Sequence, residues 1–141
     1  MSTLERAIEI AVDAHRGQRD KAGEPYILHP LRVMLRVASD EARIVALLHD
    51  VVEDSGWTLA ALAAEGFAPP ILDAVEALTK RPGETRRAAA ERAARLPLAR
   101  RVKLADNADN MELSRLPSPT EADYARLKEY AQVRAILLAA E

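Results

Sequence analysis

Apolar residues recur along this chain at the three- and four-residue spacing of helices, and polar segments with glycine or proline separate the runs. Residues 4–15 form the first run, preceded by Ser2 and Glu5 in the spacing of a capping box. Thr120 and Asp123 repeat that spacing before the last run. The alternation of apolar and polar residues that is typical of strands does not occur. The pattern therefore predicts an all-α fold of about seven or eight helices.

Proline and turn residues set the limits of the other helices. Pro30, Pro70 and Pro97 each stand at the start of a run, where proline is tolerated because its missing N–H would have no helical partner. The 141 residues are typical of one domain, so we expect a single compact domain over residues 1–141. After the first helix we expect helices over 31–38, 41–54, 59–65, 70–80, 84–95, a stretch from 97 that carries VKLADNADNMEL, and 121–140.

Composition narrows the class of protein and its location. Hydrophobic residues make up 49% of the chain and charged residues 30%, which is typical of a globular protein. The absence of cysteine excludes disulfides and thiolate metal ligands, and it fits a reducing compartment. Glu5 and Arg6 interrupt the first apolar run, which is not typical of a signal peptide, and no run approaches the ~20 apolar residues of a membrane span. We expect a cytoplasmic protein with no membrane contact.

The charge balance limits the partners. The net charge is −2, whereas binding to nucleic acid is favoured by a basic surface, so we expect no nucleic-acid partner. A ligand that carries phosphate must therefore meet a local basic cluster or a metal ion. The residues give no indication of an oligomeric state.

His49 and Asp50 are the most informative residues, because they interrupt the apolar run that begins at Ile44. Burying a carboxylate is costly unless it is paired or coordinates a metal ion, so this pair predicts a metal site. Glu53 and Asp54 follow within one helical turn and share a face with the pair. The structural alternative is that these acids form the polar end of a helix that faces water.

Two more residues complete a candidate ligand set. His29 lies between a polar loop and a predicted helix, and Asp106 follows the apolar positions of the helix that starts at Pro97. Taken alone, His29 could cap a helix and Asp106 could be a solvated surface residue. Two imidazoles and two carboxylates suit a divalent ion such as Mn²⁺, Fe²⁺, Co²⁺ or Zn²⁺. Such an ion activates water and polarises a phosphoryl oxygen, while Glu53 or Asp54 takes the proton.

Three motifs resemble a known family. HRGQRDKAGEPYILHP (residues 15–30), ALLHDVVEDS (46–55) and VKLADNADNM (102–111) contain the H…HD…D ligand pattern of the HD superfamily of metal-dependent phosphohydrolases. Their flanking residues look like the hydrolase domain of RelA/SpoT-type alarmone enzymes and the stand-alone small alarmone hydrolases. The three motifs occur in the family's order and span most of the chain.

The resemblance implies an enzyme with one bound Mn²⁺. The ion would be held by His29, His49, Asp50 and Asp106. Glu53 and Asp54 match the family's catalytic acidic pair, and Lys21 and Asn110 match positions that hold the nucleotide. The implied reaction is hydrolysis of the 3′-pyrophosphate of ppGpp or pppGpp, with release of pyrophosphate. Among other basic residues, Arg19 and Lys103 are candidates for contact with phosphate.

The sequence departs from the family pattern near the expected nucleotide. Asp20 stands where the family commonly has arginine, and Glu112 and Leu113 replace a basic and a hydroxyl residue. A carboxylate beside a pyrophosphate weakens binding unless a cation lies between them. An adenine alarmone such as ppApp, or another small phosphorylated metabolite, therefore remains open as substrate.

Two other functions stay open at this point. One is an HD-type nucleotidase or phosphodiesterase with a different substrate, and the other is a non-enzymatic nucleotide-binding module. The presence of all four ligands and of both catalytic acids favours the enzyme. Residues 81–95 lie outside the resemblance, and we hypothesise that their basic face, with Arg86 and Arg87, closes over the site.

Overall fold

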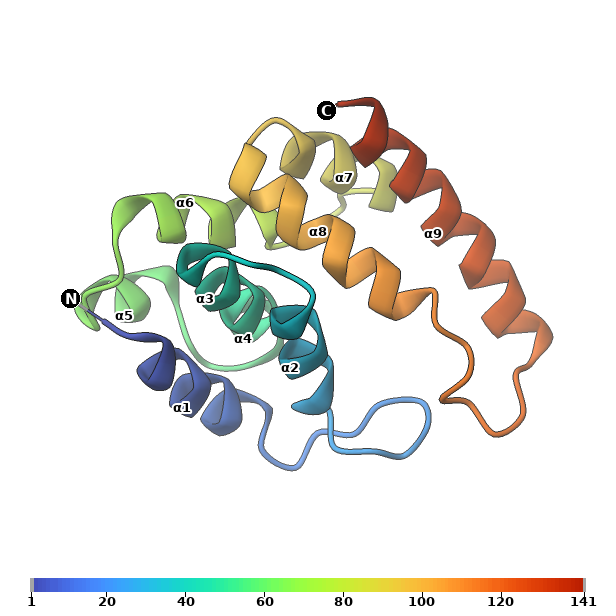
Figure 1. Ribbon diagram of the computed structural model, residues 1–141, viewed down its shortest axis with the longest axis horizontal. Coiled ribbons are helices and arrows are strands. Elements are labelled where there is room, and N and C mark those ends of the chain that lie inside the picture. Colours follow the sequence, from blue (N-terminus) through green and yellow to red (C-terminus); the bar gives the residue numbers. More distant parts are fainter. Residues whose placement is uncertain (1, 141) are drawn as a thin grey trace.

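The computed structural model describes residues 2–140, and that part of the chain is helical without a β-strand (Figure 1). Eight helices have six or more residues, and a ninth segment, α4, is a single turn. The predicted all-α fold is therefore confirmed. The segments are α1 (Leu4–His15), α2 (Leu28–Leu35), α3 (Asp40–Leu48), α4 (Val51–Asp54), α5 (Leu59–Ala64), α6 (Pro69–Leu78), α7 (Arg86–Ala94), α8 (Pro97–Asn110) and α9 (Glu121–Ala139).

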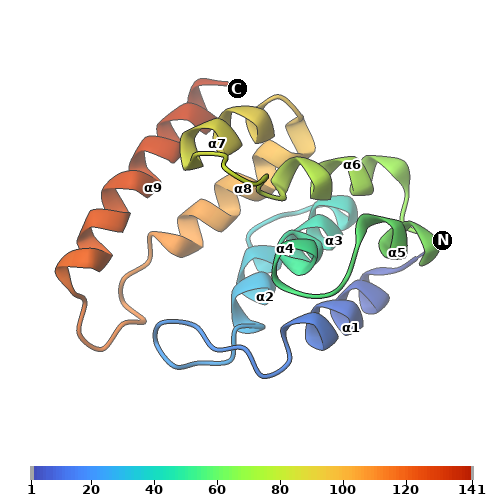
Figure 2. The same ribbon diagram turned by 180° about the vertical axis from the view of Figure 1, so that it is seen from behind.

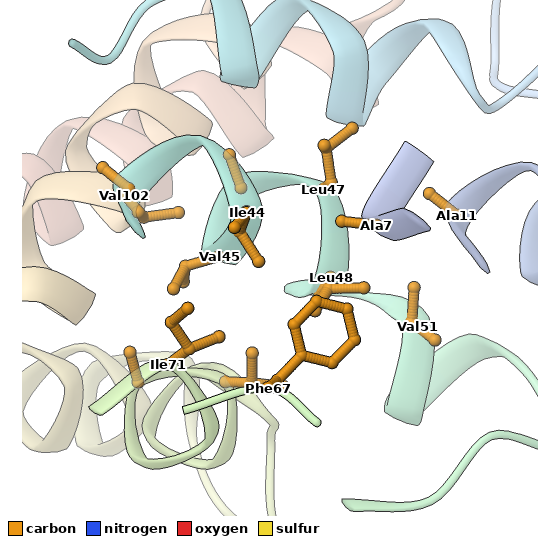
Figure 3. Packing of buried hydrophobic residues seen from close by; sticks show 14 of the residues in the cluster. Ala7, Ala11, Ile44, Val45, Leu47, Leu48, Val51, Phe67, Ile71 and Val102 are labelled. Atoms are coloured by element: carbon orange, nitrogen blue, oxygen red, sulfur yellow. The ribbon is translucent and has the colours of Figure 1, made fainter. Parts of the chain in front are cut away.

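Helix α3 forms the centre of the main core, because helices α1, α2, α6 and α8 all pack against it. Its apolar residues are nearly inaccessible to solvent and meet Phe67, Ile71 and Val102 from neighbouring elements (Figure 3). The buried α3 residues are Ala42, Ile44, Val45, Ala46, Leu47 and Leu48. Because all of α3 from Ile44 onward is apolar and buried, the end of this helix is held by the core and can keep the side chains that follow it in fixed positions.

A second and smaller apolar cluster joins α7 and α9 to the outer face of α8 (Figures 1 and 2). Its buried members are Ala90, Ala94, Val133 and Leu137, and Leu104 and Ile136 pack against them. Helix α8 thus contributes to both clusters, since its Ala99 and Val102 belong to the main core.

Two local predictions need correction. The first helix is capped by Thr3, whose side chain accepts a hydrogen bond from the Arg6 backbone N–H, and not by Ser2. The helix expected over 41–54 is divided into α3 and α4, because Asp50 has φ −106° and ψ −2°. The capping box of Thr120 and Asp123 at the start of α9 is confirmed.

Arg92 on α7 holds the connection between α6 and α7. Its guanidinium donates two hydrogen bonds to the Glu84 carboxylate, at 2.9 and 2.7 Å. It also donates to the backbone carbonyl oxygens of Ala77 and Thr79, both at 2.9 Å, at the end of α6. These carbonyl groups have no partner within the helix, so Arg92 serves as their cap. Within residues 2–140, no helix is both long and apolar enough to cross a membrane.

Candidate metal centre and adjoining cavities

Three helical elements bring the predicted ligands together. His29 lies in the first turn of α2, Asp106 lies on the inner face of α8, and His49 and Asp50 occupy the break between α3 and α4. Both side chains point toward α2 and α8, where they meet His29 and Asp106. His29, His49 and Asp106 are each less than 7% exposed.

The four side chains converge on one point. His29 Nε2 lies 2.8 Å from Asp106 Oδ1 and 3.8 Å from Asp50 Oδ2. His49 Nε2 lies 3.1 Å from Asp50 Oδ2 and 3.4 Å from Asp106 Oδ1. His29, His49 and Asp50 offer ligand atoms that all lie within 4.8 Å of one another, and Asp106 adjoins both imidazoles.

In each imidazole, Nδ1, the ring nitrogen that points away from the cluster, already forms a hydrogen bond. His49 Nδ1–H donates to the Ala46 carbonyl oxygen, and His29 Nδ1–H donates to Asp109 Oδ2 at 2.7 Å. In the neutral tautomers set by these bonds, each Nε2 presents a lone pair to the carboxylate oxygens. Among residues 2–140, the buried His49 Nε2 has no hydrogen-bond partner. A lone pair that faces a carboxylate is stabilised by a positive charge between them, and two imidazoles with two carboxylates are a donor set that fits a divalent metal ion.

The pKa shifts of the clustered residues also indicate a site that favours a positive charge. Burial lowers the pKa of the His49 imidazole, but the Asp50 and Asp106 carboxylates outweigh it, so the pKa is raised well above the usual value. Burial raises the pKa of Asp50, but the neighbouring His49 imidazole outweighs it, so the pKa is lowered below the usual value. For Asp106, burial is outweighed by Lys103 and the imidazoles, and the pKa is well below normal. The ionised carboxylates therefore favour positive charge at this point.

Three polar side chains hold the carboxylates in place. The Tyr26 hydroxyl donates to Asp50 Oδ2 at 2.6 Å. Lys103 Nζ donates to Asp106 Oδ2 at 3.0 Å, and Asn110 Nδ2 donates to Asp106 Oδ1 at 3.3 Å. Burial and the charge of Asp50 raise the pKa of Tyr26, so its hydroxyl remains a donor. Lys103 and Asn110, predicted to contact substrate, thus lie at the metal centre and contact a predicted ligand.

Glu53 and Asp54 lie on the exposed rim of this centre. Together with Asp50, Asp106 and Arg86 they line a cavity of about 350 Å³. Burial raises the pKa of both rim carboxyls, and the nearby charge of Asp50 raises them further. A carboxyl with a raised pKa beside an activated water is suited to act as a general base.

A larger cavity, of about 430 Å³, adjoins the first one and shares several lining residues with it. Its lining residues come from the loop between α1 and α2, from α2, from the end of α8 and the loop after it, and from α9. The shared residues are Tyr26, His29, Asn110 and Tyr130. A ligand can therefore place one end beside the metal ligands and the other end in the larger cavity.

The loop residues behave differently from one another. Asp20 Oδ1 accepts hydrogen bonds from the backbone N–H groups of Ala22 and Glu24, so the carboxylate shapes its own loop. Arg19 donates to the Gly23 carbonyl oxygen at 2.8 Å and closes the same loop. Arg19 and Lys21 both line the larger cavity and are exposed. The side chain of Arg19 is already bonded to the loop, which leaves Lys21 as the better candidate for contact with phosphate.

Asp109 and Tyr26 were not identified from the sequence. Asp109 is fully buried and bonds to His29, 80 positions earlier in the chain. Its only sequence signal is its spacing of three residues from Asp106, which places both on one helix face. Tyr26 carried no signal, because its partner Asp50 lies across the fold. Arg86 lines the metal cavity as hypothesised, whereas Arg87 is 79% exposed and pairs with Glu91.

The fold and the buried cluster define an all-helical domain with the donor set of a divalent metal site. The family model described as HD domain matches residues 7–140, so this chain belongs to the HD domain family. Membership implies binding of a divalent metal ion, and the His/Asp cluster could hold such an ion. The family resemblance found in the sequence motifs is confirmed.

Curated relatives share substantial identity with the chain. It is 38% identical over 140 residues to a probable GTP pyrophosphokinase of Mycobacterium leprae, covering 89% of this chain and 18% of that protein. It is 40% identical over 116 residues to a guanosine-3′,5′-bis(diphosphate) 3′-pyrophosphohydrolase of Haemophilus influenzae, covering 72% of this chain and 17% of that protein. The chain thus spans less than a fifth of the length of these relatives.

One solved structure has the same fold. It is described as a metazoan ortholog of SpoT that hydrolyzes ppGpp, and it matches with a TM-score of 0.80. The match covers 97% of this chain and 86% of that chain at 23% sequence identity. This likeness extends the agreement in fold to almost the whole chain.

Proposed function

We propose that this chain is a metal-dependent phosphohydrolase that removes the 3′-pyrophosphate of an alarmone nucleotide such as ppGpp or pppGpp. The observation that carries the proposal is the pair of imidazole Nε2 atoms that face carboxylates, beside a cavity with two free rim acids. The names of the relatives support the substrate, since one is a 3′-pyrophosphohydrolase of guanosine bis(diphosphate). The proposed unit is the single domain expected over residues 1–141.

The proposed ligands are His29, His49, Asp50 and Asp106, and the proposed ion is Mn²⁺. When bound, the ion supplies a Lewis acid for the phosphoryl oxygens and lowers the pKa of a coordinated water. Glu53 or Asp54 accepts the proton of the attacking water from its place on the rim. Water adds its hydroxyl to the departing pyrophosphate and its proton to the ribose 3′-oxygen, so that GDP or GTP and pyrophosphate are formed.

Cations on the cavity wall are placed for the phosphates. Lys103 and Arg86 line the metal cavity, and Lys21 lines the larger one. We propose that the 3′-pyrophosphate lies in the metal cavity and that the nucleoside extends past Asn110 into the larger cavity. Asn110 lines both cavities, which suits the role in nucleotide binding expected for it.

A second substrate deserves a parallel test because of the residues in the larger cavity. Glu112 and Leu113 line it, where the family commonly has a basic and a hydroxyl residue. The Asp20 carboxylate, however, bonds to its own loop, which reduces the repulsion expected from the sequence. The adenine alarmone ppApp is therefore the alternative substrate.

The deciding experiment is an assay of pyrophosphate release from ppGpp and from ppApp with purified protein. Each reaction is run with Mn²⁺, with chelator, and with the D106A variant as blank. Release that requires Mn²⁺ and is absent in D106A supports the proposal, and the faster substrate identifies the base. Absence of release from both nucleotides by a protein that binds Mn²⁺ contradicts the alarmone substrate.

A further inference from the structure

Behind the proposed metal ligands, His29 rests on a buried carboxylate that the proposed reaction does not use. Asp109 lies on α8, one turn after Asp106, and its side chain is fully buried. Asp109 Oδ2 accepts the hydrogen bond from His29 Nδ1–H at 2.7 Å. A buried carboxylate needs several polar partners to offset the loss of water, so its other contacts are informative.

Arg32 supplies those partners. Its Nε donates to Asp109 Oδ1 at 2.8 Å and its Nη2 donates to Oδ2 at 3.1 Å, in the two-bond geometry of a guanidinium and a carboxylate. Arg32 follows His29 by three positions on α2, so one helix face presents both side chains to Asp109. Arg115 donates to the backbone oxygen of Asp109 at 3.3 Å.

These contacts fix the orientation of the imidazole. Asp109 accepts a hydrogen bond from Nδ1–H, which keeps the proton on Nδ1. In the neutral imidazole the lone pair is then on Nε2, and Nε2 points at Asp106 Oδ1. Arg32 in turn prevents the Asp109 carboxylate from rotating away. Partners of this kind behind a metal-ligating histidine fix its tautomer and the direction of its ring.

We propose that Asp109 is a positioning residue for the metal ligand His29, and that Arg32 acts on the metal site through Asp109. This inference rests on the proposed metal site, but it does not depend on the identity of the substrate.

The test measures the Kd of Mn²⁺ by calorimetry on the full chain, without nucleotide. We expect D109N to raise the Kd roughly 10- to 100-fold, the range for loss of such partners. R32Q raises the Kd in the same direction. The matched control is R36Q, because Arg36, the C-cap residue of α2, forms only a long ion pair with Asp109 Oδ1 at 3.9 Å, beyond hydrogen-bond distance. It removes the same charge without removing a hydrogen bond, so its Kd stays at the wild-type value.

A double variant separates positioning from general damage. If Arg32 acts only through Asp109, then D109N/R32Q binds Mn²⁺ no more weakly than D109N alone. The visible absorption spectrum of bound Co²⁺ changes in D109N and not in R36Q, because the ring of one ligand is no longer held. A purely structural role would lower the melting temperature and leave this spectrum unchanged.

The contrary outcomes are equally definite. A D109N variant that folds and binds Mn²⁺ with the wild-type Kd overturns the inference. If D109N does not fold, the comparison of R32Q with R36Q decides, and equal Kd values overturn it. A wild type that binds Mn²⁺ but hydrolyses no alarmone contradicts the proposed substrate and leaves this test intact. A wild type that binds no Mn²⁺ overturns both proposals.

Discussion

At the scale of single residues, the carboxylates of the site fall into two groups. Those of Asp50 and Asp106 lie inside the centre and contact the imidazoles, whereas those of Glu53 and Asp54 lie on the rim and contact neither imidazole. The pKa of each inner carboxyl is lowered, and that of each rim carboxyl is raised. This division favours metal binding by the inner pair and proton transfer by the rim pair.

The first prediction follows from that division. We expect E53Q and D54N each to lower kcat by about 10²- to 10⁴-fold, because an amide cannot accept the proton from water. The Kd of Mn²⁺ stays close to the wild-type value, since the substitutions leave the backbone bond from Asp54 to Asp50 in place and neither side chain bonds to a proposed ligand. Steady-state kinetics and calorimetry on the same preparations check both parts. Loss of Mn²⁺ binding in either variant would place that residue among the metal ligands instead.

The proposed ligands could be predicted from the sequence, whereas the residues that hold them in place could not. His49 and Asp50 are conspicuous because they interrupt an apolar run, whereas His29 and Asp106 are ambiguous taken alone and the family motifs favour them as ligands. Asp109 could not be assigned a role, because its partners His29 and Arg32 come from another helix. Such contacts are set by how helices pack, and one-dimensional spacing does not encode them.

At the scale of elements, helix α7 joins the site through one arginine. Arg86 pairs with Glu129 at 2.8 Å, lies 5.1 Å from the centre of the Tyr130 ring, and lines the metal cavity. Arg87 is the next residue but points into solvent and pairs with Glu91. Neighbouring residues of the same type thus form a matched pair for experiment.

The second prediction uses that pair. We expect R86A to raise the KM for the alarmone about tenfold, the effect of losing one hydrogen bond to a charged group. R87A leaves the KM unchanged, because its side chain does not reach the cavity. Steady-state kinetics at constant salt checks this. Equal effects of the two substitutions would indicate a general effect of charge and not a contact.

The third prediction concerns the connection between α6 and α7. The hydrogen bonds from Arg92 lower the pKa of Glu84 from 4.5 to about 2. A carboxyl whose pKa is lower in the folded state contributes stability above its unfolded pKa and loses it as the pH falls toward the folded pKa. E84Q therefore lowers the melting temperature near neutral pH, and its difference from wild type shrinks as the pH falls from about 4.5 toward 2.

Thermal unfolding over a pH series checks this prediction. The matched control is E91Q, because Glu91 forms an exposed pair with Arg87 on the same helix, and exposed pairs contribute little. A difference between E84Q and wild type that stays constant down to the acid end of the series would contradict the role of the Glu84 charge.

Helix positions were largely predictable from capping and proline signals, but the break between α3 and α4 was not. Residues 41–54 are helical in periodicity throughout, and nothing in the spacing marks Asp50 as a turn. The break places two of the proposed ligands, His49 and Asp50, at a helix end, and such a deviation from the local pattern is commonest at functional sites.

At the scale of the whole molecule, the metal centre joins parts of the chain that are distant in sequence. The proposed ligands come from α2, from the α3–α4 break and from α8. An ion held by all of them binds the folded state and not the unfolded chain. Its binding free energy therefore adds to the free energy of unfolding.

The fourth prediction is that Mn²⁺ stabilises the fold. At about 100 times its Kd, the ion raises the free energy of unfolding by about 2.7 kcal/mol. Chemical denaturation with Mn²⁺ and with chelator measures this difference. It is absent in D106A and retained in the control D40A, because Asp40 lies 85% exposed at the start of α3. Retention of the full effect in D106A would exclude Asp106 as a ligand.

The two apolar clusters have a consequence for dynamics. Helices α7 and α9 rest on a small cluster around Leu137 and Val133, whereas α3 is enclosed by the main core. Backbone amides of α9 should exchange with deuterated solvent through local opening at a lower free energy than those of α3. Yet α7 and α9 contribute Arg86 and Tyr130 to the metal cavity. A substrate bound in this cavity would therefore slow deuterium uptake along α9, although none of the proposed metal-binding residues lies on that helix.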